Sequence, residues 1–559
     1  MSTRLIGKMI GGISMNKIYV NQVGFMPEGA KKAVLNFKAN AFKLIDESGK
    51  EVFNGEVSHF GTDEISGEDT YVADFSSFNE TGKFVVSASD ARSVPFTIGD
   101  NAYEKLMHDV CRCFYYLRCG QGLDEKYAGK FYHKPCHLTK ATVYGEDVAP
   151  VDVSGGWHDA GDYGRYSTAG SIALAHLLYG VRFFPKLVDV SFDIPKVKCD
   201  DGFLPDILAE AKVELDFLMK MQREDGSVWH KVTTFNHAPF IMPEEDKGEL
   251  FLFSVSSLAT ADIAAVFALA HTVYFDYDKA YAKLLKERAL KAYEWLEDNR
   301  EPLLFHNAEG SNTGEYPENE DYSNRFWAAA SLYEVTGETR FFEDAKAMLP
   351  LIEKYDKSDA FKEYTGDVFT CMGWADVAGL GLLSLILKND DSTLVSFAKK
   401  KIIGEADRLV ENAKANGFGL CMAKDNFIWG SNMELLKYLM VLTVANVLEP
   451  KRAYATALTA GLDYLLGCNS MDVSYVTGNG QKAFRNPHLR PITAAGLDEP
   501  WPGLVSGGPN INRQDERAQT LSDDTAPMKC YIDHVDCYSL NEITIYWNSP
   551  LVFVLAGLK

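Results

Sequence analysis

The sequence lacks an excess of positive charge. Its 559 residues include 56 Lys and Arg against 78 Asp and Glu, which gives a formal net charge of −22. Nucleic-acid affinity depends on Lys and Arg that neutralise phosphates, and anionic membranes attract basic segments. The charge therefore argues against both partners and favours, weakly, a neutral or cationic ligand.

The sequence also lacks long apolar runs. No run reaches the ~18 residues of a membrane-spanning helix. The first seventeen residues, MSTRLIGKMIGGISMNK, contain basic residues but no sustained apolar stretch, so we expect no signal peptide. Met15 is a candidate start, which would make the first fourteen residues additional, and we assign residues 1–16 to an N-terminal extension. The location stays open: extracellular if a signal has been removed, otherwise cytoplasmic.

Closely spaced cysteines and short-period repeats are scarce as well. The ten cysteines are scattered, which is a poor disulfide framework for a chain of this size. Buried thiols together with a metal site fit this distribution better. The absence of a fixed short repeat argues against a solenoid.

Two regions differ in their periodicity. Residues 17–100 contain short β-rich runs separated by turn clusters, which predicts a small β-sandwich. The runs cover residues 18–20, 33–37, 42–45, 71–75, 84–87 and 94–98.

Residues 101–559 have helical periodicity. Apolar stripes recur at helical spacing within residues 207–218 and 285–296, and further helices are predicted at 257–274, 326–334, 377–387, 433–447 and 454–465. Ser431 and Glu434 have capping-box spacing. Helix after helix with little strand signal predicts a large all-α toroid. Residues 468–548, rich in Gly, Asn, Pro, Asp and Tyr, are expected to form long ordered loops.

The densest group of polar residues lies between Asp152 and Tyr166. Asp159 and Asp162 flank Ala160-Gly161, and two carboxylates at this spacing can orient one water molecule. From this fragment alone, a calcium loop or an Asp-capped helix start fits equally well. Aromatic residues, 12% of the chain, suit sugar stacking but also suit a large helical core.

The segment GGWHDAGDYGRY (155–166) closely resembles the signature of glycoside hydrolase family 9. Further matches follow in family order along most of the chain, and the ordered set is specific although each motif alone is weak. They are HAPFIMPEED (237–246), ATAD (259–262), RFWAAA (325–330), WADVAGLG (374–381), WGSNM (429–433), YLLGCN (464–469), VTG (476–478), NPHLRP (486–491), PGLVSGGPN (502–510) and NEI (541–543).

The resemblance implies roles for three carboxyl groups. Asp162 matches the catalytic base, Asp159 the carboxylate that helps to hold the water, and Glu542 the general acid. Without the other motifs, Glu542 would be taken for an exposed helix glutamate. Inversion at the anomeric carbon requires acid and base roughly 6.5–9.5 Å apart, and the acid needs a raised pKa.

The resemblance also implies substrate contacts. His488 and Arg490 match a substrate-contacting pair, and Leu489 replaces the second His of the family's Pro-His-His-Arg-Pro segment. They are expected to donate hydrogen bonds to sugar hydroxyls, and Tyr538 matches a ring near the cleaved sugar. Trp157, Trp327 and Trp429 are candidate stacking platforms, although core packing is the simpler role for each.

Cys119, Cys136, His137 and His158 match a zinc site in the branch of the family that carries an N-terminal immunoglobulin-like domain. Two thiolates and two imidazoles suit a closed, structural Zn²⁺ site, which would brace the catalytic loop next to His158. Without the resemblance, buried core cysteines and histidines would be favoured. Calcium is a second candidate cation, for which the acidic clusters are 244–246, 318–321 and 523–524.

We therefore expect an (α/α) six-hairpin toroid, residues 101–559, preceded by an immunoglobulin-like sandwich, residues 17–100. The first functional hypothesis is a monomeric, inverting endo-β-1,4-glucanase acting on cellulose, mixed-linkage glucan or cello-oligosaccharides. The second is an exo-acting member: a cellobiohydrolase, β-glucosidase or exo-glucosaminidase. A non-catalytic carbohydrate-binding protein and a catalytic metal centre at His158, Asp159 and Asp162 are the alternatives from other classes.

Overall fold

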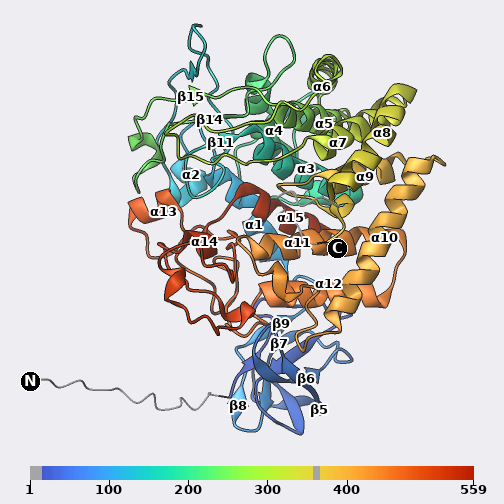
Figure 1. The fold of residues 1–559 in the computed structure, drawn as a ribbon. Coiled ribbons are helices and arrows are strands. Elements are labelled where there is room, and N and C mark those ends of the chain that lie inside the picture. The colour runs from blue at the N-terminus through green and yellow to red at the C-terminus, as the bar shows by residue number, and fades with distance from the viewer. Residues whose placement is uncertain (1–15, 357–365, 559) are drawn as a thin grey trace, which may run out of the picture.

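A computed structural model describes residues 16–356 and 366–558. Figure 1 shows a small all-β domain at the N-terminal end of the described chain and a large helical domain above it. The predicted fold class is confirmed in both parts. The expected N-terminal extension lies almost wholly outside the described residues.

The N-terminal domain is a β-sandwich whose two faces are joined by one long strand. In the described residues the strand order is β1-β3-β6-β5-β4-β7-β9-β2, with β8 on β7. The first half of β5 pairs with β4 and its second half pairs with β6. The register of the β5–β6 pairing shifts between His59 and Gly61. Eighteen buried side chains, among them Phe25, Phe75 and Phe96, fill the space between the faces. The strands are β1 (Ile18–Tyr19), β2 (Gly24–Phe25), β3 (Lys32–Leu35), β4 (Ala41–Asp46), β5 (Glu51–Asp63), β6 (Glu68–Asp74), β7 (Gly82–Ala88), β8 (Ala91–Arg92) and β9 (Phe96–Ile98).

Strand β5 was not predicted from the sequence. This thirteen-residue strand is mostly exposed or half-buried and carries polar side chains on both faces. Such a strand has no apolar alternation, so hydrophobic periodicity cannot detect it.

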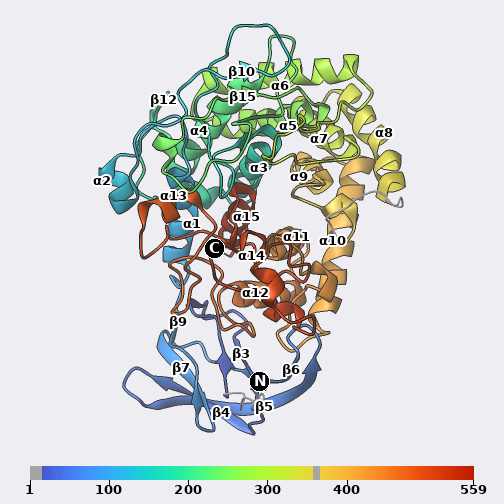
Figure 2. The ribbon, with the colours of Figure 1, turned by 60° about the vertical axis from the view of Figure 1, so that its left-hand side comes forward.

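Within the part of the chain that the structure describes, twelve helices make a barrel of two rings (Figure 2). The inner helices are apolar around most of their circumference, as buried helices must be, whereas α6, α8 and α10 keep a polar outer face. The inner ring is α3 (Ser167–Phe183), α5 (Ser257–Tyr274), α7 (Tyr322–Thr336), α9 (Ala378–Lys388), α11 (Ser431–Leu448) and α15 (Ile545–Ala556), and the outer partners are α4 (Asp206–Met221), α6 (Lys279–Asp298), α8 (Thr339–Asp356), α10 (Thr393–Ala413), α12 (Arg452–Leu465) and α1 (Glu104–Tyr116).

The inner helices pack side by side from α15 through α3, α5 and α7 to α9, and α11 packs on α15. α10 packs against both α9 and α11 and so links the two ends of the ring. The chain from 466 to 544 contains, among its α-helices, only α13 (Arg490–Ala495) and α14 (Tyr538–Asn541), in agreement with the predicted long loops. A small sheet of short strands lies on the barrel: β10 (Thr142–Val143), β15 (Phe251–Leu252), β14 (Lys231–Thr233) and β11 (Arg165–Tyr166).

Two expectations need correction. α5 is 18 residues long and apolar enough to pass the length and hydropathy test for a membrane span, although no such run was expected. Because 89% of this segment is buried inside the protein, the core of a barrel accounts for its composition. Ser431 and Glu434 do not form a capping box, since α11 is preceded by Gly430 in a left-handed conformation and has no side-chain cap.

The sandwich is joined to the barrel by buried hydrogen bonds. The Asn21 side chain donates to Asp463 Oδ1 at 2.9 Å, and the Gly417 amide donates to Asp63 Oδ2 at 2.9 Å. The Met528 amide donates to the Ile65 carbonyl at 2.8 Å. These contacts reach α12, the segment between α10 and α11, and the long C-terminal loops, so the sandwich supports the scaffold of the site.

Candidate active site

The loop that carries Asp159 and Asp162 is anchored by hydrogen bonds to two buried glutamate side chains. The Trp157 amide donates to Glu214 Oε2 at 2.6 Å, and the indole Nε1 donates to Glu210 Oε1 at 2.9 Å. Arg118 forms an ion pair with Glu210 at 2.7 Å. Burial raises the pKa of Glu214 to about 8. Trp157 therefore belongs to the core and anchors the loop.

Gly161 allows two distant segments to meet. A Cβ atom at Gly161 would lie 2.2 Å from the carbonyl oxygen of His488, so no larger residue fits without backbone movement. Arg490 strengthens this contact: its Nη1 donates to the Gly161 carbonyl at 2.6 Å and its Nε to the Ala238 carbonyl at 2.7 Å. His488 also pairs in parallel with Glu542 along the backbone. Glu542 is thus brought to Asp159 and Asp162, although hundreds of residues separate it from them in the sequence.

The three carboxyl groups line one cavity of about 310 Å³. None of its lining residues comes from the sandwich. Aromatic side chains form much of the wall, which suits the apolar faces of a sugar ring. The lining residues are Asp159, Ala160, Asp162, Tyr166, His237, Gly314, Tyr316, Trp374, Ile428, Trp429, Gly430, Met433, Glu434, Lys437, Glu542, Thr544, Tyr546 and Trp547.

The barrel places the cavity at the N-terminal ends of inner helices. Asp162 lies shortly before α3 and Glu542 shortly before α15, while Tyr316, Trp374 and Trp429 precede α7, α9 and α11. Residues at the starts of five inner helices therefore meet in one cavity.

The two carboxyl groups with opposite assigned roles have opposite pKa shifts. Burial opposes ionisation of Asp162, yet the hydrogen bond and attraction of His237, with the charge of Arg490, hold its pKa below the usual value. His237 Nδ1 lies 2.8 Å from Asp162 Oδ2. Burial and the negative charges of Asp162 and Asp159 raise the pKa of Glu542 to about 8. Near neutrality Asp162 is therefore ionised and Glu542 carries a proton.

Asp159 lies beside Asp162. Burial, and then the charge of Asp162, raise the pKa of Asp159 well above its usual value, while the Tyr316 hydroxyl donates a hydrogen bond to its Oδ2. Oδ1 of each aspartate is buried and has no hydrogen-bond partner among the described residues. Two such oxygens can both accept hydrogen bonds from one water molecule.

His488, Arg490 and Tyr538 do not line the cavity itself. His488 Nδ1 lies 2.7 Å from the Val535 carbonyl, which can only accept, so Nδ1 carries the ring proton. Burial lowers the pKa of His488, which leaves Nε2 of a neutral ring as an acceptor, in contrast to the donor role expected from the sequence. The half-exposed Tyr538 ring stands 5.4 Å from Trp429 and 6.0 Å from His488.

Sequence reasoning missed several cavity residues. His237 and Trp374 were part of family motifs but were given no role, and Tyr316 was not singled out. Of the three tryptophans considered as platforms, Trp429 lines the cavity, whereas Trp157 and Trp327 are buried in the core.

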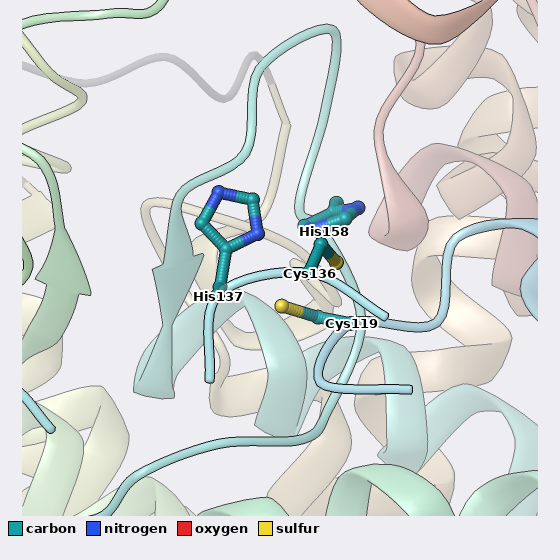
Figure 3. A group of neighbouring side chains, drawn as sticks. All are labelled: Cys119, Cys136, His137 and His158. Atoms are coloured by element: carbon teal, nitrogen blue, oxygen red, sulfur yellow. Dashed lines mark hydrogen bonds between the residues drawn. The ribbon is translucent and has the colours of Figure 1, made fainter. Parts of the chain in front are cut away.

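The predicted metal ligands form one buried cluster. Cys119, Cys136, His137 and His158 each offer one ligand atom, and these atoms all lie within 4.8 Å of one another. Figure 3 shows the four side chains close together, with the adjacent Cys136 and His137 on one segment and Cys119 and His158 on two others. None of the chain's ten cysteines is disulfide-bonded. His137 Nδ1 is buried without a hydrogen-bond partner among the described residues, while its Nε2 lies 3.3 Å from Asp246 Oδ2. A carboxylate on the far nitrogen is how metal-binding imidazoles are commonly oriented, so the donor set fits a metal ion.

The three acidic clusters considered for calcium differ in how deeply they are buried and in the partners they contact. The Asp523 side chain is 96% exposed and pairs with Arg513, and Asp246 contacts His137. In contrast, Glu318 and its surroundings are buried: burial and neighbouring carboxylates raise its pKa well above the usual value. The buried acidic group consists of Asp262, Glu318, Glu320, Asp321 and Asp376.

An aromatic cavity that holds one ionised and one protonated carboxyl group, at the end of a helical barrel, is the arrangement expected of a glycoside hydrolase. The family model described as "Glycosyl hydrolase family 9" matches residues 103–555, and "Cellulase N-terminal ig-like domain" matches residues 14–93. The chain belongs to glycosyl hydrolase family 9 and is an enzyme.

Known proteins are similar to this chain over nearly its whole length. It is 66% identical to a cellodextrinase of Butyrivibrio fibrisolvens over 97% of this chain and 100% of that protein. The structure of AaCel9A in complex with cellobiose-like isofagomine is 35% identical, with a TM-score of 0.87 over 97% of this chain and 99% of the other. A Zn-binding triple mutant of the family 9 endoglucanase J30 is 31% identical, with a TM-score of 0.88 over 95% of this chain and 99% of the other.

Proposed function

We propose that the enzyme hydrolyses β-1,4-glucosidic bonds of glucan chains and cello-oligosaccharides with inversion at the anomeric carbon. The opposite pKa shifts of Asp162 and Glu542, which line the same cavity, carry this proposal. An inverting hydrolase needs an ionised base and a protonated acid at the same pH.

In the proposed reaction, Asp162 removes a proton from a water molecule that attacks the anomeric carbon. Its negative charge is maintained by His237. Asp159 accepts a second hydrogen bond from the same water and is itself fixed by Tyr316. Glu542 delivers its proton to the glycosidic oxygen as the bond breaks, so the proton that the acid loses is balanced by the proton that the base gains.

Arg490 acts in this scheme as a positioning residue, because it holds the carbonyls of Gly161 and Ala238. The Trp429 and Tyr538 rings, 5.4 Å apart, offer a stacking surface, and His488 Nε2 accepts a hydrogen bond from a sugar hydroxyl. Asp162→Asn tests the assignment: turnover of cellohexaose should fall by roughly three orders of magnitude or more while oligosaccharide binding persists. Near-normal turnover would remove Asp162 from its role.

We infer that the cluster of Cys119, Cys136, His137 and His158 binds zinc. Two thiolates and two imidazoles complete a tetrahedral Zn²⁺ site and leave no position for water, which makes the ion structural. Since His158 directly precedes Asp159, a bound ion would fix the start of the catalytic loop. Elemental analysis of the purified enzyme should find about one zinc per chain.

We further infer that calcium binds the buried acidic group around Glu318. Asp262 Oδ2 and Asp321 Oδ1 are buried without a hydrogen-bond partner among the described residues, and carboxylate oxygens are the ligands Ca²⁺ prefers. Added Ca²⁺ should raise the melting temperature of metal-stripped enzyme, with Mg²⁺ as the control.

Endo action is the first proposal, in line with the endoglucanase J30 relative. Exo or short-chain action is favoured by a separate observation: the cavity is small, about 310 Å³, and the 66% identical relative is a cellodextrinase. Initial products from cellohexaose distinguish the two modes, and proton NMR of the first product should show the α-anomer. A β-anomer formed first would contradict inversion.

A further inference from the structure

A buried acid–base pair lies in the wall of the catalytic cavity. Glu434 and Lys437, on the first two turns of α11, line the same cavity as Asp162 and Glu542. Only 4% of Glu434 and 1% of Lys437 are exposed. Lys437 Nζ contacts Glu434 Oε1 and lies 3.9 Å from Cys371 Sγ.

Stability does not explain this pair. Removing two charges from water is costly, and a buried ion pair is often no more stabilising than an apolar pair of similar volume. Glu434 does not cap α11 either, because that helix starts without a side-chain cap. Its inner-ring neighbours Leu435, Leu436 and Leu439 show that apolar side chains fill this part of the barrel.

One oxygen of Glu434 is available for a ligand. Oε1 contacts Lys437, whereas Oε2 is buried and has no hydrogen-bond partner among the described residues. Lys437 itself is held by packing: a Cβ atom at Gly373 would lie 3.1 Å from its Cδ. Gly373 precedes Trp374, which forms another part of the cavity wall. The lysine therefore holds the carboxylate in place in the cavity wall.

We infer that Glu434 Oε2 accepts hydrogen bonds from hydroxyl groups of a glucosyl unit in the cavity and thereby selects short cello-oligosaccharides. A chain end carries a hydroxyl group where an internal unit carries a glycosidic bond. A buried acceptor rejects a ligand that lacks the matching hydroxyl, because the acceptor is then left without a partner. Lys437 is a positioning residue that orients Glu434.

This inference rests on the short-chain mode of the proposed function, and Glu434→Gln tests it. The measurement is kcat/KM for cellotriose relative to kcat/KM for carboxymethylcellulose. A hydrogen bond to a charged group contributes roughly 10- to 100-fold, so we expect this ratio to fall by at least about tenfold. Glu405→Gln is the matched control, since Glu405 is also buried and forms an i,i+3 pair with Arg408 at 2.5 Å, but on the outer helix α10 and away from the cavity.

Glu434→Leu/Lys437→Met provides a second test if the single variant does not fold, because it removes the buried acid and the buried base together. The double variant should also lose the preference for cellotriose, with a melting temperature near that of the parent. An unchanged ratio in the folded variant, or an equal loss on both substrates, would overturn the inference. The proposed function fails separately, if Asp162→Asn still hydrolyses both substrates.

Discussion

Replacing Glu542 with Gln removes the proposed proton donor while preserving its size. The backbone contacts of residue 542 should persist, since Gly507 N donates to its carbonyl at 2.9 Å. With a pKa of about 8, Glu542 is protonated in roughly nine of ten molecules at pH 7. General acid catalysis contributes about 10²–10⁴-fold, so kcat/KM for cellotetraose should fall about 10³-fold, or ~4 kcal/mol in the barrier.

The leaving group provides the decisive comparison. A dinitrophenolate leaves without protonation, so dinitrophenyl cellobioside should lose less than about tenfold in the same variant. The parent enzyme should lose activity on cellotetraose as the pH rises through about 8, because Glu542 then loses its proton. This alkaline limb should vanish in Glu542→Gln. Equal losses on both substrates, or an alkaline limb that persists at the same pH, would refute the assignment of Glu542 as the acid.

Three further results are expected. His237→Gln should move the acid limb of the kcat/KM profile to higher pH, because His237 lowers the pKa of Asp162 and its loss lets that pKa rise. An acid limb at the same pH as in the parent enzyme would exclude this role. Gly161→Ala should lower kcat about 10²-fold by separating the catalytic segments, whereas Gly404→Ala, with open space on α10, should not. Zinc chelation should lower the melting temperature in step with activity, whereas activity lost from a fully stable protein would indicate a catalytic metal.

Local patterns predicted the architecture well. The residue range 257–274, expected to be helical, is the observed extent of α5, and the stripes at 207–218 and 285–296 lie on the buried faces of α4 and α6. Apolar periodicity succeeds there because each helix buries one face or its whole surface. The capping-box prediction was wrong because a spacing of Ser and Glu does not reveal that Glu434 turns toward Lys437.

The identities of the catalytic and metal-binding residues could be predicted from the sequence, whereas most of the contacts around them could not. Ordered motifs indicated Asp159, Asp162 and Glu542, and the four Cys and His residues that the structure brings together. They gave no role to His237 or Tyr316, whose contacts with the two aspartates come from distant loops. They also suggested that His488 donates to sugar, whereas its ring proton is used by Val535.

The sequence by itself determined the family, the helical ring and the chemical groups available for catalysis, because periodicity and residue identity are local properties of the chain. The tertiary structure supplied the physical cause that keeps Asp162 ionised and Glu542 protonated, and it alone showed that Glu434 shares their cavity. Burial, the distances between charges and the shape of a cavity arise from contacts between segments hundreds of residues apart, and no local pattern encodes them.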